Sequence, residues 1–316
     1  MRIAFKSNHI IAAASLALAA CSSDRFDVPG SETQGEMTIS LSGQIIQESV
    51  TRANDDGFAD GDVMGVYIVD YTGNNPGVLQ NSGNRGDNVR HTFDEQNYRW
   101  NSAYDLFWKD KHTRIDVYGY YPFGSPENVN SYSFTVQTDQ NKSNSDGTMG
   151  NYEASDFLWG KVAGVEPTAS VIRLPMTHRM ANARVRLEEG SGFAEGEWTV
   201  LKKQVLVTNT IQNASIDLAT GTVSPSGEIS SAAIIPTVND TEWRAIVVPQ
   251  TVAAGTSLFS ITIDGTPYKF AKNEDFTYMA GKMSNFTIRI DKKSAQGDYT
   301  PVSYTHLRAH ETLRHL

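Results

Sequence analysis

Cysteine is nearly absent from the 316-residue sequence, because Cys21 is the only one. A disulfide framework is therefore excluded, and a hydrophobic core alone must hold the fold together. With 39% hydrophobic and 10% aromatic residues, a chain of this length can bury such a core.

Long apolar segments and positive charge are also scarce. The only extended apolar run, Ile10–Ala20, is too short to span a bilayer as a helix. The formal net charge is −9, and it falls by two more units without the basic residues Arg2 and Lys6. An acidic surface of this kind does not attract nucleic acid or anionic lipid, so we expect no nucleic-acid partner.

Recognisable catalytic motifs are missing as well. The sequence has no GxSxG elbow, no HExxH pair and no phosphate-binding loop. The acidic segment Asn54–Asp62 does not have the ligand spacing of a calcium loop, and we expect it to be a solvated turn before a strand. His91, His112 and His178 are too far apart for a metal motif, and His178 is expected to be packed or hydrogen-bonded in its strand. We expect no enzyme, no metal and no cofactor.

The N-terminus has the pattern of an export signal. Arg2 and Lys6 precede the apolar run, which ends in small residues. The stretch Leu18–Cys21 resembles a lipobox, the sequence at which bacterial lipoproteins are cleaved before a lipid-bearing cysteine. That resemblance implies a signal peptide at residues 1–20 and lipidation of Cys21. The alternative is an ordinary secretory signal with an incidental cysteine.

Beyond a polar tether at residues 21–36, the main signal is alternation of apolar and polar residues. Met37, Ile39 and Leu41 alternate with polar residues, as a half-buried strand requires. Turn signals rich in Gly, Pro and Asn separate many such runs, whereas helical spacing is rare. Further strands are expected at Val63–Tyr71, Ile115–Tyr118, Phe134–Val136, Asp156–Val162, Ala181–Leu187, Trp198–Asn209, Thr241–Gln250, Ser257–Asp264 and Asn285–Asp291. The pattern indicates an all-β fold built of sandwiches.

A polar, glycine-rich break at Glu188–Gly192 follows one of these strands. It predicts two β domains of ordinary length, at residues 37–188 and 189–301.

Several short motifs occur in a specific order along the chain. They are Thr51–Ala53 followed by Gly57–Tyr67, then Tyr120–Pro122, His178–Val185, Val248–Thr251 and Ala280–Lys282. In this order they resemble the Bacteroides-type fimbrillins of the FimA/Mfa-like family. The resemblance implies two tandem transthyretin-like β-sandwich domains in an outer-membrane lipoprotein, located at the cell surface or in a fimbrium, that assembles with other fimbrial subunits.

The resemblance also implies a mechanism of assembly. In such subunits an arginine-specific protease removes the first strand, and a strand from another subunit fills the groove that remains. Carried onto this sequence, the displaced strand is Met37–Ile46, with Met37, Ile39, Leu41 and Ile45 as its apolar residues. The cut then falls between Arg52 and Ala53. Arg25 is the competing site, although a cut there leaves the strand in place.

Two other functions remain open from the residues. A monomeric surface lipoprotein that binds glycan or protein would keep Met37–Ile46 and would need no protease. An all-β glycoside hydrolase would need a cleft with paired carboxylates, which the sequence does not locate.

The C-terminal segment, residues 302–316, differs from the rest of the chain. It contains His306, His310 and His315 and abandons both the strand pattern and the acidic composition. It resembles translated adapter sequence, and we expect it to be non-native. The alternatives are a genuine short basic helix and, third, a histidine-rich metal site.

Overall fold

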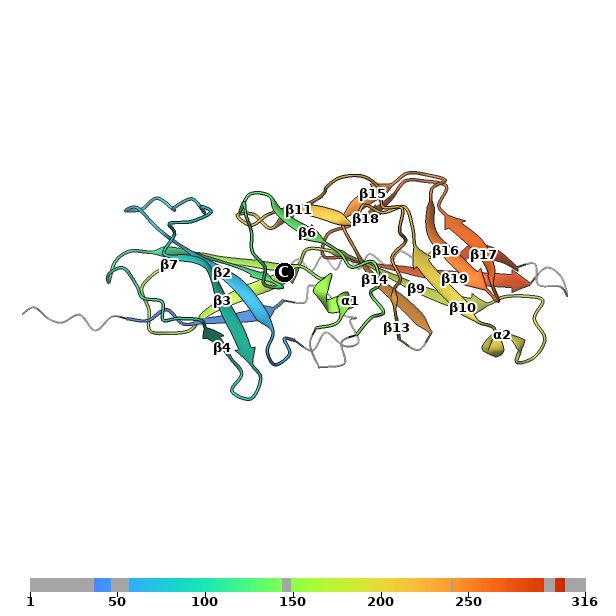
Figure 1. Cartoon of the computed structure of the whole chain (residues 1–316), viewed down its shortest axis with the longest axis horizontal. Coiled ribbons are helices and arrows are strands. Elements are labelled where there is room, and N and C mark those ends of the chain that lie inside the picture. The colour runs from blue at the N-terminus through green and yellow to red at the C-terminus, as the bar shows by residue number, and fades with distance from the viewer. Residues whose placement is uncertain (1–36, 47–56, 144–148, 240, 293–298, 305–316) are drawn as a thin grey trace, which may run out of the picture. The chain divides into compact units, whose positions relative to one another are not determined.

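The computed structural model describes residues 37–46, 57–143, 149–239, 241–292 and 299–304. Within these ranges the chain forms twenty strands and two helices of four residues each (Figure 1). The strands form where apolar and polar residues alternate, or where apolar residues run continuously between turns. The predicted all-β fold is therefore confirmed.

The first half of the described chain is dominated by one sheet of seven strands. In spatial order these are β1 (Leu41–Ile45), β8 (Ile172–His178), β7 (Leu158–Val165), β5 (Ile115–Tyr121), β2 (Val63–Asp70), β3 (Gly86–Asp94) and β4 (Arg99–Ser102). The pair β1 and β8 is parallel, whereas the other neighbours are antiparallel. In this order β1 stands at one end of the sheet and β4 at the other.

The central strands of this sheet are buried on both faces. In β2 all residues from Met64 to Val69 are buried. Met64, Val66 and Ile68 belong to one hydrophobic cluster. Tyr67 and Val69 belong to a second cluster, because successive side chains of a strand point to opposite faces. This double burial explains why the sequence of β2 is continuously apolar.

Four smaller sheets are formed mainly by strands of the second half of the chain. A five-stranded sheet has the order β13 (Thr237–Asn239), β14 (Glu242–Val247), β9 (Ala181–Glu189), β19 (Met283–Lys292) and β20 (Tyr299–Tyr304). A three-stranded sheet has the order β10 (Lys203–Val207), β16 (Ser257–Ile263) and β17 (Thr266–Ala271). A second three-stranded sheet has the order β12 (Thr222–Pro225), β11 (Asn213–Asp217) and β6 (Tyr132–Thr135). The last sheet pairs β15 (Gln250–Val252) with β18 (Phe276–Tyr278). The helices are α1 (Asn151–Ala154) and α2 (Glu197–Val200).

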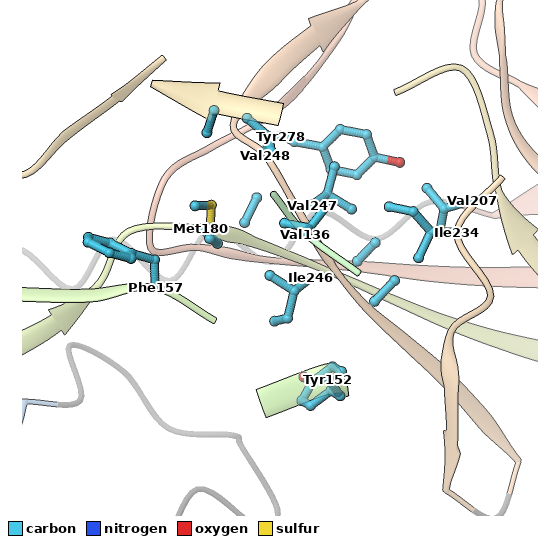
Figure 2. Packing of buried hydrophobic residues seen from close by; sticks show 14 of the residues in the cluster. Val136, Tyr152, Phe157, Met180, Val207, Ile234, Ile246, Val247, Val248 and Tyr278 are labelled. Carbon is cyan, nitrogen blue, oxygen red and sulfur yellow. The ribbon is translucent and has the colours of Figure 1, made fainter. Parts of the chain in front are cut away.

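The second hydrophobic cluster packs strands from both halves of the sequence against one another. Tyr118 of β5 and Phe157 belong to it, together with Ile246 of β14 and Tyr278 of β18. Figure 2 shows part of this cluster, including Phe157, Ile246 and Tyr278. The seven-stranded sheet therefore shares a core with the strands that follow it.

Strand β9 occupies a notable position relative to the expected domain border. It ends at Glu189, and it pairs with β14 on one side and with β19 on the other. Ala181–Glu189 thus lies inside the sheet of the second half, and residues 37–316 form one unit. The division into domains at residues 37–188 and 189–301 stays a prediction.

One expected strand is partly wrong. The sequence predicts a strand over Trp198–Asn209, but Glu197–Val200 is helix α2 and β10 begins only at Lys203. The carboxylate of Glu197 accepts a hydrogen bond from the Ala194 N–H at 2.9 Å, two residues before the N-cap Gly196. The ammonium group of Lys203 donates to the Leu201 carbonyl at 3.2 Å and so satisfies a main-chain acceptor beyond the helix.

The last described strand reaches into the segment expected to be foreign. Strand β20 pairs antiparallel with β19, and Val302 is the partner of Arg289. Residues 302–304 therefore continue a strand of the five-stranded sheet, whereas residues 305–316 lie outside the described residues. The non-native origin of the tail stays a prediction.

Candidate strand-exchange groove

The segment Met37–Ile46 is extended, and its side chains alternate between two environments. Ile39 and Leu41 are each 5% exposed. Gly43 is also buried, whereas Ser40 and Gln44 on the opposite face are exposed. The alternation predicted for this strand is therefore confirmed, and its odd-numbered residues form the inward face.

Strand β1 is bonded to β8 in parallel. The register runs from Leu41 opposite Ile172 to Ile45 opposite Met176. The bonds continue beyond the strand, since the Ile46 N–H donates to the Met176 carbonyl at 2.7 Å.

The other side of the segment is also bonded. The Ile39 N–H donates to the Leu106 carbonyl at 2.7 Å, and the Trp108 N–H donates to the Met37 carbonyl at 3.0 Å. Farther along, the indole N–H of Trp100 in β4 donates to the Gly43 carbonyl at 3.2 Å. The two end strands of the sheet thus approach each other, and the segment is bonded to β8 on one side and to Leu106, Trp108 and Trp100 on the other.

The inward face covers the first hydrophobic cluster, which we call the β1 cluster. Besides Ile39 and Leu41, its buried members are Met64, Val66, Ile68, Val89, Phe93, Trp100, Leu106, Trp108, Ile115, Val117, Tyr121, Leu158, Ile172, Leu174 and Met176. Burial of one large aliphatic side chain contributes about 1.5–3 kcal/mol. Loss of the segment would uncover this cluster and leave main-chain groups of β8 without partners.

A cavity of about 770 Å³ lies at the C-terminal end of β1, and Ile45, Phe58 and Glu153 are among its lining residues. The wall also holds Asp156 and His178, whose Oδ2 and Nδ1 atoms are 2.7 Å apart. The expectation that His178 is packed or hydrogen-bonded in its strand is confirmed by this contact. Among the described residues there is no group of three His, Cys, Asp or Glu side chains that would hold a metal ion.

The part of the acidic segment that the structure describes is a turn that enters β2. Asp60 is exposed, and its carboxylate accepts a hydrogen bond from the Glu95 N–H at 3.1 Å. Asp62 is half-buried and accepts from the Ala59 N–H at 2.8 Å and from the Tyr121 hydroxyl at 2.9 Å. Burial raises the pKa of Asp62 above its ordinary value, and these two hydrogen bonds only partly oppose the rise.

The sequence-predicted residues of the groove lie together. Ile39 and Leu41 are buried, and Met37 and Ile45 are half-buried on the same face. Arg52, Ala53 and Cys21 lie outside the described residues. Sequence analysis missed Trp100, which reaches this strand from 57 positions away.

The family described as fimbrillin-like matches residues 51–302, which is most of the chain. The chain belongs to the fimbrillin-like family. The order of short motifs along the sequence had indicated this family, and the match confirms it. No curated protein matches this fimbrillin-like chain in sequence.

The fold of this fimbrillin-like chain is also found in solved structures. Two crystal structures, each of a "putative cell adhesion protein", come from Bacteroides uniformis and Bacteroides ovatus. They are 15% and 14% identical to this chain, with TM-scores of 0.58 and 0.59, and each comparison covers 86% of this chain and 98% of the other. At these identities the likeness supports the fold. In the described part of the fimbrillin-like chain, no helix has the length and apolar character needed to cross a membrane.

Proposed function

We propose that this chain is a fimbrial subunit, or a pilus-associated surface lipoprotein, that works by assembly and adhesion and not by catalysis. Membership of the fimbrillin-like family supports the fimbrial role. The observation that carries the mechanism is the position of the segment Met37–Ile46. It supplies two buried side chains and edge hydrogen bonds to a sheet that is otherwise made of later residues.

The mechanism is exchange of this first strand. A cut between Arg52 and Ala53 by an arginine-specific protease separates Met37–Ile46 from the rest of the chain. The segment is then held only by its apolar contacts and hydrogen bonds. A strand from another subunit satisfies the same backbone groups and fills the same apolar slot, so exchange links two subunits without new covalent bonds.

The proposed location follows from the N-terminal signal. Lipidation of Cys21 anchors the precursor in the outer membrane, and the cut after Arg52 removes the anchor together with the first strand. Cell surface and fimbrium are thus successive locations of one chain. The partners are other fimbrial subunits, the membrane lipid around the anchor, and the arginine-specific protease.

The N-terminal sequence of the protein recovered from cells tests this proposal. We expect assembled material to begin at Ala53, and unassembled precursor to have a blocked, lipidated Cys21. A start at Phe26, after Arg25, would retain the first strand and would overturn strand exchange at this site. Strand exchange at this site would also be overturned if all of the surface material began at a blocked Cys21.

The second candidate is a monomeric surface lipoprotein that binds a glycan or protein and retains its first strand. The cavity at the end of β1 favours it, because aromatic and carboxylate side chains such as Phe58, Tyr121 and Asp156 line the same concave space. Glycan binding by the uncut chain, without polymer formation on protease treatment, would establish this function instead.

A further inference from the structure

Gly43 is unusual for a residue in the middle of a strand. Glycine weakens a strand, and it often marks a point where other atoms approach the backbone closely. Gly43 is buried on the inward face of β1, and it is not among the glycines with positive φ. The backbone conformation therefore does not require glycine here. The side chains packed around residue 43 explain why a larger residue is absent.

Two side chains leave little room at this position. A Cβ atom at residue 43 would lie 3.1 Å from Sδ of Met64 and 3.5 Å from Cε2 and Cζ2 of Trp100. A methyl group would touch the indole and require a small shift of the flexible Met64 side chain. Any branched side chain would place further atoms into the space that the indole fills.

The indole of Trp100 is held firmly in place. The side chain is 7% exposed and its N–H donates to the Gly43 carbonyl. The ring meets Phe58 edge-on at 4.8 Å between centroids and packs against Phe93 at 5.3 Å. Moving it away from residue 43 would break this aromatic contact set and a buried hydrogen bond.

We propose that Trp100 makes the groove selective for a small residue in the strand that occupies it. This inference rests on the proposed strand exchange. The occupant is an extended segment, parallel to β8, with bulky apolar residues at the positions of Ile39 and Leu41 and glycine or alanine at the position of Gly43. The indole N–H recognises a main-chain carbonyl there, so it accepts any sequence that meets the size limit.

The first test, in the intact chain, is whether a side chain larger than alanine is tolerated at position 43; we call this restriction the size limit. Gly43→Val is compared with Gln44→Val, which places the same side chain on the exposed face of β1. We expect a lower urea midpoint for Gly43→Val than for Gln44→Val. We also expect Gly43→Val to lower the midpoint less in the Trp100→Ala background than in the otherwise unchanged chain. Equal midpoints for the two valine variants would overturn the size limit. So would an unchanged loss in the Trp100→Ala background.

Exchange is then tested with peptides. The chain, cut after Arg52 and verified by mass, is offered a fluorescent peptide of residues 37–46 or its Gly43→Val counterpart. We expect the valine peptide to be captured about tenfold more weakly, and the difference to shrink in cut Trp100→Ala protein. Equal capture would overturn the size limit alone. Capture of neither peptide would overturn strand exchange. The urea midpoints test the packing at residue 43 independently of that result.

Discussion

The side chain of Gln140 binds the main chain of Ile246 at both of its polar groups. The amide oxygen accepts from the Ile246 N–H at 2.7 Å, and the amide nitrogen donates to the Ile246 carbonyl at 2.8 Å. Gln140 is 1% exposed and lies 106 positions from its partner. One side chain thus extends the hydrogen bonding of β14 and ties the segment before α1 to a strand of the second half.

We predict that Gln140→Ala lowers the free energy of unfolding by about 2–4 kcal/mol, because it removes two hydrogen bonds and leaves buried main-chain groups without partners. Gln137→Ala, at an exposed position nearby, is the control and should change stability by less than about 0.5 kcal/mol. Urea unfolding measures both. A loss for Gln140→Ala no larger than that of the control would show that the link is unimportant.

The anchor prediction concerns Cys21. Cys21→Ser should abolish acyl labelling and move the protein out of the membrane fraction, because the acyl chains supply the apolar area that holds it there. Ser22→Ala is the control, and it should keep the label. Membrane association of the serine variant in high salt would contradict lipid anchoring at this residue.

Maturation is predicted to depend on Arg52. Arg52→Ala should leave a full-length lipoprotein that does not polymerise, because Met37–Ile46 stays covalently joined to the groove it fills. Arg25→Ala is the matched control and should polymerise normally. Immunoblots of unheated cell extracts show polymer ladders directly. Normal ladders from Arg52→Ala would rule out strand exchange triggered at this bond, though not the fold.

We predict that titration of Asp62 makes the free energy of unfolding depend on pH. Because burial raises its pKa in the folded state, the folded protein holds this proton to higher pH than the unfolded chain does. Stability from this group is therefore greatest at low pH and falls as pH rises through the folded pKa. Asp62→Asn removes the titration, so the variant should gain stability relative to the natural chain between about pH 3 and pH 7. Urea midpoints of both proteins across this range check the sign, and a constant difference would contradict it.

The sequence predicted local features of the groove well. Alternation is a property of neighbouring residues, so the inward face of Met37, Ile39 and Leu41 could be read directly. The helix at Glu197–Val200 was missed because the apolar residues from Trp198 onward also fit a strand pattern, and a single helical turn has no periodicity of its own.

Features that depend on the closure of the sheet could not be predicted. Trp100 contacts Gly43, and the Tyr121 hydroxyl binds Asp62, across 57 and 59 positions of sequence. No local pattern indicates that β4 returns beside β1. The glycine at residue 43 was the one available signal, because glycine inside an alternating strand points to a close approach.

The last prediction separates β20 from the residues that follow it. Truncation after Tyr304 should leave the thermal midpoint unchanged, because the deleted residues 305–316 contain few apolar side chains and can bury little area. Truncation after Lys292 also removes β20, whose pairing with β19 extends from Tyr299 to Tyr304. Strand β19 then becomes an open edge, so this shorter chain should have a lower midpoint and aggregate more readily. Scanning calorimetry and light scattering compare the two. An equal loss for both truncations would show that residues 305–316 stabilise the fold, and it would count against their foreign origin.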